Sequence, residues 1–147
     1  MHCKKILLVL LILFLSNLSL SYEYNSIKTN KAYLRVGPGK WYPIKWVLKI
    51  PGLPIKILQE NGGYKMVELF DGTQGWIASS LISNKKKLLV VEDALIYSKS
   101  KKPLVKVKRF VVLTSLGCYN KVVDEFCEVR IKKIKGYIHK DKIWGFN

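Results

Sequence analysis

Apolar and polar side chains alternate along several short segments of this chain. The segment 126–132 alternates strictly, and its apolar face comprises Cys127, Val129 and Ile131. Residues 64–69 behave similarly, and residues 107–113 are rich in β-branched side chains. Alternation of this kind is typical of antiparallel strands with one buried and one solvated face. We therefore expect strands at these three places.

Turn-forming residues separate such segments at short intervals. No stretch of helical length carries an apolar stripe with the period of about 3.6 residues that an amphipathic helix requires. Short strands interrupted this often predict an all-β fold built as a small barrel or sandwich. The predicted turns contain Gly37-Pro38-Gly39, Pro51-Gly52, Asn61-Gly62-Gly63, Asp71-Gly72, Gly117 and Gly136.

The first 21 residues have the pattern of a targeting segment. Lys4 and Lys5 precede an unbroken apolar run at 6–15, and Ser19-Leu20-Ser21 then supplies small residues. A membrane-spanning helix needs about 20 apolar residues, twice the length of this run. We therefore predict that residues 1–21 are a cleaved signal peptide. The mature chain is then periplasmic or secreted and does not span the membrane.

The remainder of the chain contains an internal repeat. Gly75-Trp76-Ile77 returns 61 residues later as Gly136-Tyr137-Ile138. We interpret this as a tandem duplication, with a first domain at 28–83 and a second at 88–147. A domain of about 60 residues is only marginally stable alone, so the two have reason to pack together.

Two of the three cysteines lie outside the predicted leader, Cys118 and Cys127. An even number of cysteines in an exported chain predicts a disulfide. The competing interpretations are a Cys–His pair with His139, or a zinc site made of the same three residues. Three ligands at irregular spacing fit no usual zinc pattern. We therefore expect a disulfide, a surface histidine and no metal or cofactor.

Motifs in both halves resemble the bacterial SH3-like domain family in its exported tandem form. The string AYLRVGPGKWYPIKWVL at 32–48 is similar to the opening strand and long loop of that family. The resemblance implies two small SH3-like barrels and structural roles for the motif residues. These are Arg35, Gly37, Pro38, Gly52, Gly75 and Trp76 in the first copy and Gly136, Tyr137, Trp144 and Gly145, with the two cysteines, in the second.

Three large aromatic residues, Trp41, Tyr42 and Trp46, lie in or beside the long loop of the first copy. One interpretation is a ligand-facing patch, for which the resemblance implies peptidoglycan peptides or other wall components as ligands. The other is that these rings cover the end of the barrel or the interface between the domains. The sequence leaves both interpretations open.

Basic residues greatly outnumber acidic ones, 26 to 10, which gives a formal charge of +16. Such a charge is common in nucleic-acid-binding proteins, but export separates the protein from cytoplasmic nucleic acid. Anionic wall polymers, carboxylated peptides and lipid headgroups are better partners. A purely compositional origin of the lysines is the alternative.

These observations favour binding over catalysis. The acids are adjacent in sequence, as Glu92-Asp93 and Asp124-Glu125. Because adjacent residues in a strand point to opposite faces, neither pair is suited to general acid–base catalysis. We expect a non-catalytic exported module that recognises cell-wall peptidoglycan or another envelope component. The alternative is an interaction factor without wall affinity, which binds an extended peptide of an envelope or host protein.

Overall fold

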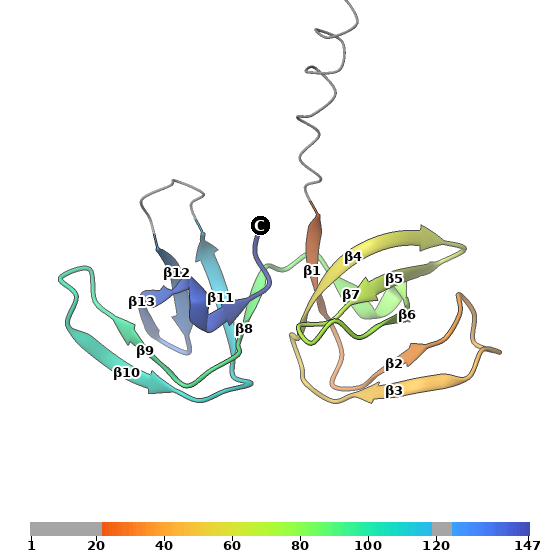
Figure 1. The fold of residues 1–147 in the computed structure, drawn as a ribbon, viewed down its shortest axis with the longest axis horizontal. Coiled ribbons are helices and arrows are strands. Elements are labelled where there is room, and N and C mark those ends of the chain that lie inside the picture. The colour runs from red at the N-terminus through yellow and green to blue at the C-terminus, as the bar shows by residue number, and fades with distance from the viewer. Residues whose placement is uncertain (1–21, 119–124) are drawn as a thin grey trace, which may run out of the picture.

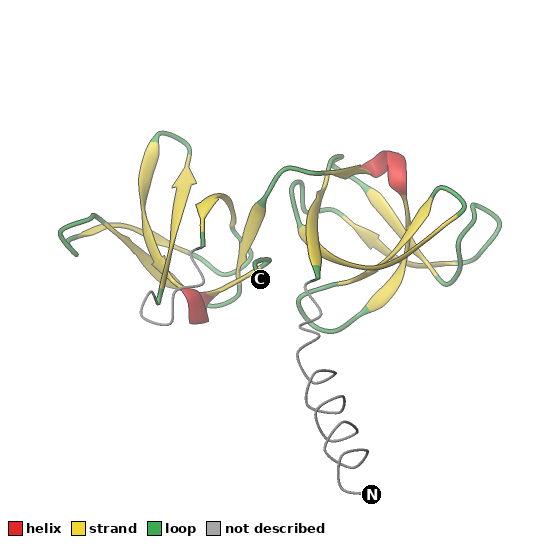
Figure 2. Cartoon of the chain, turned by 90° about the horizontal axis from the view of Figure 1, so that it is seen from above, coloured by secondary structure: helices red, strands yellow, loops and turns green. Residues whose placement is uncertain are grey.

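The structure is a computed structural model that describes residues 22–118 and 125–147. The predicted signal peptide at 1–21 lies outside the described residues. The chain forms two antiparallel sheets of seven strands each, in two lobes joined by one connection (Figures 1 and 2). This confirms the predicted all-β fold with two SH3-like domains. Within the described ranges, no helix is both long and apolar enough to cross a membrane.

The first sheet has the strand order β3-β2-β6-β5-β4-β1-β7. It begins at β1, ahead of the domain start at residue 28 expected from the sequence. A short 3-10 helix, η2 at Ser79–Leu81, leads into its last strand. The strands are β1 Glu23–Ile27, β2 Ala32–Arg35, β3 Ile44–Leu48, β4 Pro54–Asn61, β5 Tyr64–Glu68, β6 Gln74–Ala78 and β7 Ile82–Ser83.

The second sheet repeats this arrangement position by position, in the order β10-β9-β13-β12-β11-β8-β14. Its 3-10 helix, η3 at Lys140–Lys142, again precedes the last strand. Because the two sheets have the same strand order, β8 occupies the position in the second sheet that β1 occupies in the first. The strands are β8 Lys87–Val90, β9 Ala94–Tyr97, β10 Pro103–Val107, β11 Val112–Gly117, β12 Phe126–Ile131, β13 Ile134–His139 and β14 Ile143–Trp144.

The alternation in the sequence corresponds to the burial seen in these strands. In β12, Cys127 and Val129 are fully buried while Arg130 is exposed. The single strand expected at 107–113 is wrong, because β10 ends and β11 begins inside this segment. Phe110 adopts a left-handed conformation with φ of 69°, and the N–H of Val111 donates to the carbonyl of Lys108. This turn separates the two strands.

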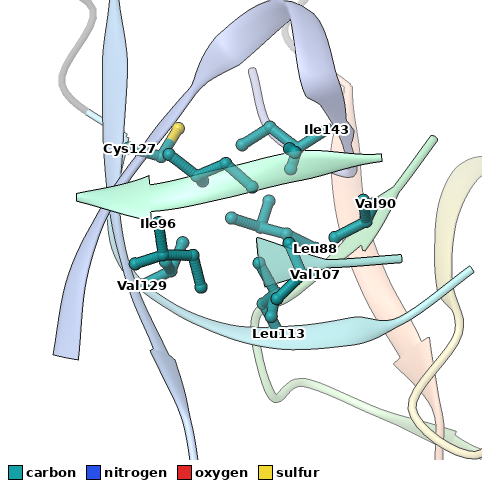
Figure 3. Close-up of a cluster of buried hydrophobic side chains, with 10 residues drawn as sticks. Leu88, Val90, Ile96, Val107, Leu113, Cys127, Val129 and Ile143 are labelled. Atoms are coloured by element: carbon teal, nitrogen blue, oxygen red, sulfur yellow. The ribbon is translucent and has the colours of Figure 1, made fainter. Parts of the chain in front are cut away.

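Each lobe has its own hydrophobic core, and β8 contributes to both. Leu88 and Val90 are buried in the second core, which Figure 3 shows between the strands of that lobe. Leu89, which points the opposite way, is buried in the first core. All three side chains are 0% exposed. In Figure 1, β8 runs along the side of the second lobe that faces the first. The two domains therefore pack through a shared strand.

Further contacts join the lobes around β8. The rings of Tyr24 and Trp144 meet edge to face, with centroids 5.2 Å apart, and those of Phe70 and Phe110 lie 5.6 Å apart. Gly145 has φ of 115°, and a Cβ there would lie 2.7 Å from that of Pro54 in the first domain. A side chain at this position would force the lobes apart.

The repeated glycines Gly75 and Gly136 mark equivalent strand crossings. A Cβ on Gly75 would lie 2.9 Å from the carbonyl oxygen of Arg35, and one on Gly136 would lie 2.5 Å from that of Tyr97. Here β2 crosses β6 and β9 crosses β13. Both crossings need a residue without a side chain, which explains the repeat physically.

Candidate functional site

The hairpin formed by β2 and β3, with its turn at 36–43, presents large apolar side chains to solvent. We call residues 32–48 the aromatic hairpin. Because β3 is the end strand of its sheet and pairs only with β2, its residues 44–47 are exposed on both faces. Ile44 and Val47 are 45% and 41% exposed. The hairpin therefore offers an apolar surface that the core does not use.

The three predicted binding residues all lie on the aromatic hairpin. Trp41 is 76% exposed and Trp46 is 58% exposed, so neither of these rings covers the barrel end or the domain interface. Tyr42 is 38% exposed, and its ring centroid lies 6.0 Å from that of Trp41. The structure thus places Trp41 and Tyr42 together at the tip and Trp46 in the middle of β3.

The motif residues of the first copy hold this tip in shape. The Arg35 Nη1 donates a hydrogen bond of 2.8 Å to the carbonyl oxygen of Tyr42. The Tyr42 ring packs so closely on Gly37 that a Cβ there would lie 2.5 Å from the ring, and a Cβ on Gly39 would lie 2.6 Å from the Trp41 ring. Arg35, Gly37 and Gly39 therefore position the exposed rings.

The charged residues of the segment 28–49, which contains the aromatic hairpin, are all positive. Residues 28–49 contain no Asp or Glu, and a hydrogen bond with Lys31, with the positive charges nearby, lowers the pKa of the Tyr33 phenol. The cations of this segment are Lys28, Lys31, Arg35, Lys40, Lys45 and Lys49. Exposed aromatic rings among cations fit an anionic partner with flat or apolar parts.

A pocket in the second domain brings together residues that the sequence did not identify as a site. It has a volume of about 260 Å³ and is lined by Tyr97, Ser98, Lys101, Phe126 and Tyr137. The resemblance implies a structural role for Tyr137, and the structure shows that this residue also lines the pocket. The turn between β9 and β10 leaves these rings accessible, and sequence patterns alone do not reveal how such a turn folds.

The second-domain cysteines form the predicted disulfide, with an S–S distance of 2.03 Å. Both nitrogens of His139 face carboxylates: Nδ1 lies 2.6 Å from Asp141 and Nε2 lies 3.1 Å from Glu125. Because the sulfurs are bonded to each other, a thiolate–imidazole pair is not formed. Across the described ranges, no cluster of three or more His, Cys, Asp or Glu side chains could hold a metal ion.

Because of these two carboxylates, we expect the contribution of His139 to stability to depend on pH. Hydrogen bonds with Glu125 and then Asp141 raise the pKa of the imidazole above 6.5. Because the pKa of His139 is higher in the folded than in the unfolded protein, its protonated ring stabilises the folded state. This contribution is fully present below the pKa of the unfolded state and is lost as pH rises through the pKa of the folded state. The imidazole should therefore titrate by NMR with a midpoint above 6.5.

His139→Gln provides the comparison. The stability difference between wild type and this variant should be larger at about pH 5.5 than at about pH 8.5. A difference in urea midpoint that is the same at both pH values would contradict the assignment. Because His139 is 37% exposed, the effect should be small.

Comparison with known proteins places the first domain in a family. Residues 28–84 match the family model described as bacterial SH3 domain. No curated protein matches the chain. Solved structures of NlpC2 and NlpC1 from Trichomonas vaginalis are similar over 84% and 87% of this chain, with 17% and 18% identity and TM-scores of 0.40. The chain spans about half the length of these structures, 48% and 47%.

Proposed function

Because the first domain of this chain is a bacterial SH3 domain, we propose that the protein is a non-catalytic exported binding module of the cell envelope. It works in the periplasm or outside the cell, and it binds cell-wall peptidoglycan or another anionic envelope component. The aromatic hairpin is the binding surface. The observation that carries this proposal is the exposure of Trp41 and Trp46, 76% and 58%, on a basic hairpin.

The physical basis is a preorganised surface with two kinds of contact. The rings of Trp41, Tyr42 and Trp46 can stack on apolar or flat parts of a ligand, while the surrounding lysines attract carboxylates. The hydrogen bond from Arg35 to the tip reduces the conformational freedom lost on binding. No cofactor is required for binding of this kind.

Alanine substitution of both tryptophans tests the proposal. Trp41→Ala/Trp46→Ala should weaken binding to purified peptidoglycan sacculi at least about tenfold, since a buried interface tryptophan often contributes about 2 kcal/mol or more. The melting temperature should change little, because both rings are solvent-exposed in the free protein. Sedimentation of the protein with sacculi, analysed beside its thermal unfolding, gives both quantities.

Ile134→Ala is the matched control, since Ile134 is a 40% exposed apolar residue in the other domain. It should bind sacculi like the wild type. Wild-type binding should also weaken from about 0.15 M to about 1 M salt, because the screening length falls from about 8 Å to about 3 Å. Unchanged binding by the double variant, or binding insensitive to salt, contradicts the proposal.

A second candidate partner is an extended peptide of an envelope or host protein. It is favoured by the position of β3 at the end of its sheet, where an extended chain can add as a further strand. Pulldown from envelope extract and pulldown on purified sacculi separate the two. Retention of an envelope protein without affinity for sacculi would identify the interaction factor.

A further inference from the structure

The pocket of the second domain is built by four separate elements. Tyr97 ends β9, Ser98 and Lys101 belong to the following turn, Phe126 begins β12, and Tyr137 lies in the middle of β13. The rings of Tyr97 and Phe126 meet edge to face with centroids 6.3 Å apart. Three strands and a tight turn thus form the pocket without any residue of the aromatic hairpin.

The first domain places different residues at the equivalent strand crossing. There Arg35 pairs with Trp76, as Tyr97 pairs with Tyr137 in the second domain. Arg35 reaches back to the turn at 36–43 through its hydrogen bond with Tyr42. In the second domain the turn at 98–102 is shorter and the crossing residue is a tyrosine. The duplicated domains therefore present different surfaces, a projecting hairpin and a pocket.

The turn holds Lys101 in a conformation that lysine rarely adopts. Its φ is 61°, in the left-handed region that favours glycine. Hydrogen bonds from Lys101 N–H to the Ser98 carbonyl, 2.9 Å, and from Ser98 N–H to the Lys102 carbonyl, 2.8 Å, fix this geometry. A glycine would form the turn with less strain, so the lysine side chain is the feature that the turn adds to the pocket.

The Lys101 ammonium is available to a ligand. In the part of the chain that the structure describes, no carboxylate forms an ion pair with it. Glu125 and Asp141 are engaged by His139, whose ring centroid lies 5.0 Å from that of Phe126. The cation at the rim of the pocket therefore favours an anion and disfavours a cationic guest.

The side chains that line the pocket limit the chemistry of the part of the ligand that carries no charge. The lining is mainly apolar, and its polar groups are the phenol hydroxyls of Tyr97 and Tyr137, the Ser98 hydroxyl and the Lys101 ammonium. Ser98 Oγ already bonds with Ser100 and with the N–H of Lys102. A polyhydroxylated sugar would lose more hydrogen bonds with water than these few groups can replace. Its volume of about 260 Å³ is below that of typical sites for drug-sized ligands, about 300–1,000 Å³. The apolar side chain of a single amino-acid residue is therefore of suitable size for this pocket.

We propose that this pocket binds the carboxyl-terminal residue of a peptide, with an apolar side chain between Tyr97, Phe126 and Tyr137 and the free carboxylate on Lys101. This site is independent of the aromatic hairpin, and the proposal does not require the hairpin to bind the cell wall. The two surfaces lie on domains that pack against each other through β8, which contributes side chains to both cores.

The test uses N-acetyl-alanyl-leucine with a free carboxylate and the same peptide with a terminal amide as probes. NMR titration of the mature chain should show shifts at Tyr97, Phe126 and Tyr137, with a Kd of about 1 mM for the acid. The amide should bind about tenfold more weakly, because it loses the charge-assisted hydrogen bond with Lys101.

Lys101→Gly removes the ammonium and fits the positive φ, so the turn is retained. It should lower the affinity for the acid to that for the amide and leave the amide unchanged. Lys99→Ala, at an exposed position of the same turn that does not line the pocket, should bind both probes like the wild type. Tyr97→Ala should weaken binding of both.

Three results would overturn the proposal. These are equal affinities for acid and amide in the wild type, shifts that avoid the pocket, and stronger shifts there with glucuronate than with the peptide, which would indicate a sugar-acid site. The Trp41→Ala/Trp46→Ala variant should keep its affinity for the peptide. Failure of wall binding and failure of peptide binding are thus separate outcomes.

Discussion

Leu89→Ala is expected to destabilise both domains together. Leu89 lies in β8, a strand of the second sheet, yet its side chain is 0% exposed in the core of the first domain. Truncating a buried leucine to alanine usually costs about 2–5 kcal/mol. Because β8 is held by both cores, the loss should appear in the unfolding of the whole chain.

Urea unfolding followed by amide hydrogen exchange measures this coupling. Protected amides of β5 and of β12 should lose protection by the same free energy in Leu89→Ala. Leu95→Ala is the control, because Leu95 is also in a strand but is 38% exposed, and we expect it to change stability by about 0.5 kcal/mol. If only the first domain loses protection, the two domains unfold independently and the shared-strand interpretation is wrong.

Removal of the Cys118–Cys127 disulfide is expected to lower the stability of the second domain by about 2–3 kcal/mol, as the chain-entropy treatment gives for a short loop. The bond links the ends of β11 and β12 across nine positions of sequence. Without it, the unfolded chain gains freedom while the folded sheet keeps its pairing. This loss is a large fraction of the total free energy of unfolding of a small domain.

Thermal unfolding with and without dithiothreitol measures the effect. The wild type should melt at a lower temperature when reduced, and Cys118→Ala/Cys127→Ala should melt alike in both conditions. Thiol titration of the mature chain before reduction should detect no reactive group. A melting temperature that does not respond to reduction would show that the disulfide contributes nothing to stability.

Much of the fold was predictable because strand periodicity and the repeat are local properties of the sequence. The alternation around Cys127 and Val129 predicted β12 and its buried face. The recurrence of Gly75 as Gly136 predicted equivalent places in two domains, and the structure shows the strand crossings that require them. Cysteine number and the leader pattern predicted the disulfide without any geometry.

Other features depend on contacts between distant segments, which sequence patterns do not contain. The residues around Phe110 have the β-branched composition of a strand, but the chain turns there, and the Phe110 ring meets that of Phe70 in the other domain. The second-domain pocket was missed because its rings come from β9, β12 and β13. The part played by Leu89 in the first core also required knowledge of how the lobes pack.

The free edges of β3 and β10 have a consequence for self-association. Each sheet ends in one of these strands, and unpaired strand edges are templates for aggregation. Both edges carry the features that discourage it: Pro43 precedes β3 and Lys45 lies within it, while Pro103 begins β10 and Lys106 follows. Two copies that met edge to edge would bring like charges together. Growth of filaments by edge-to-edge pairing of identical molecules is therefore disfavoured.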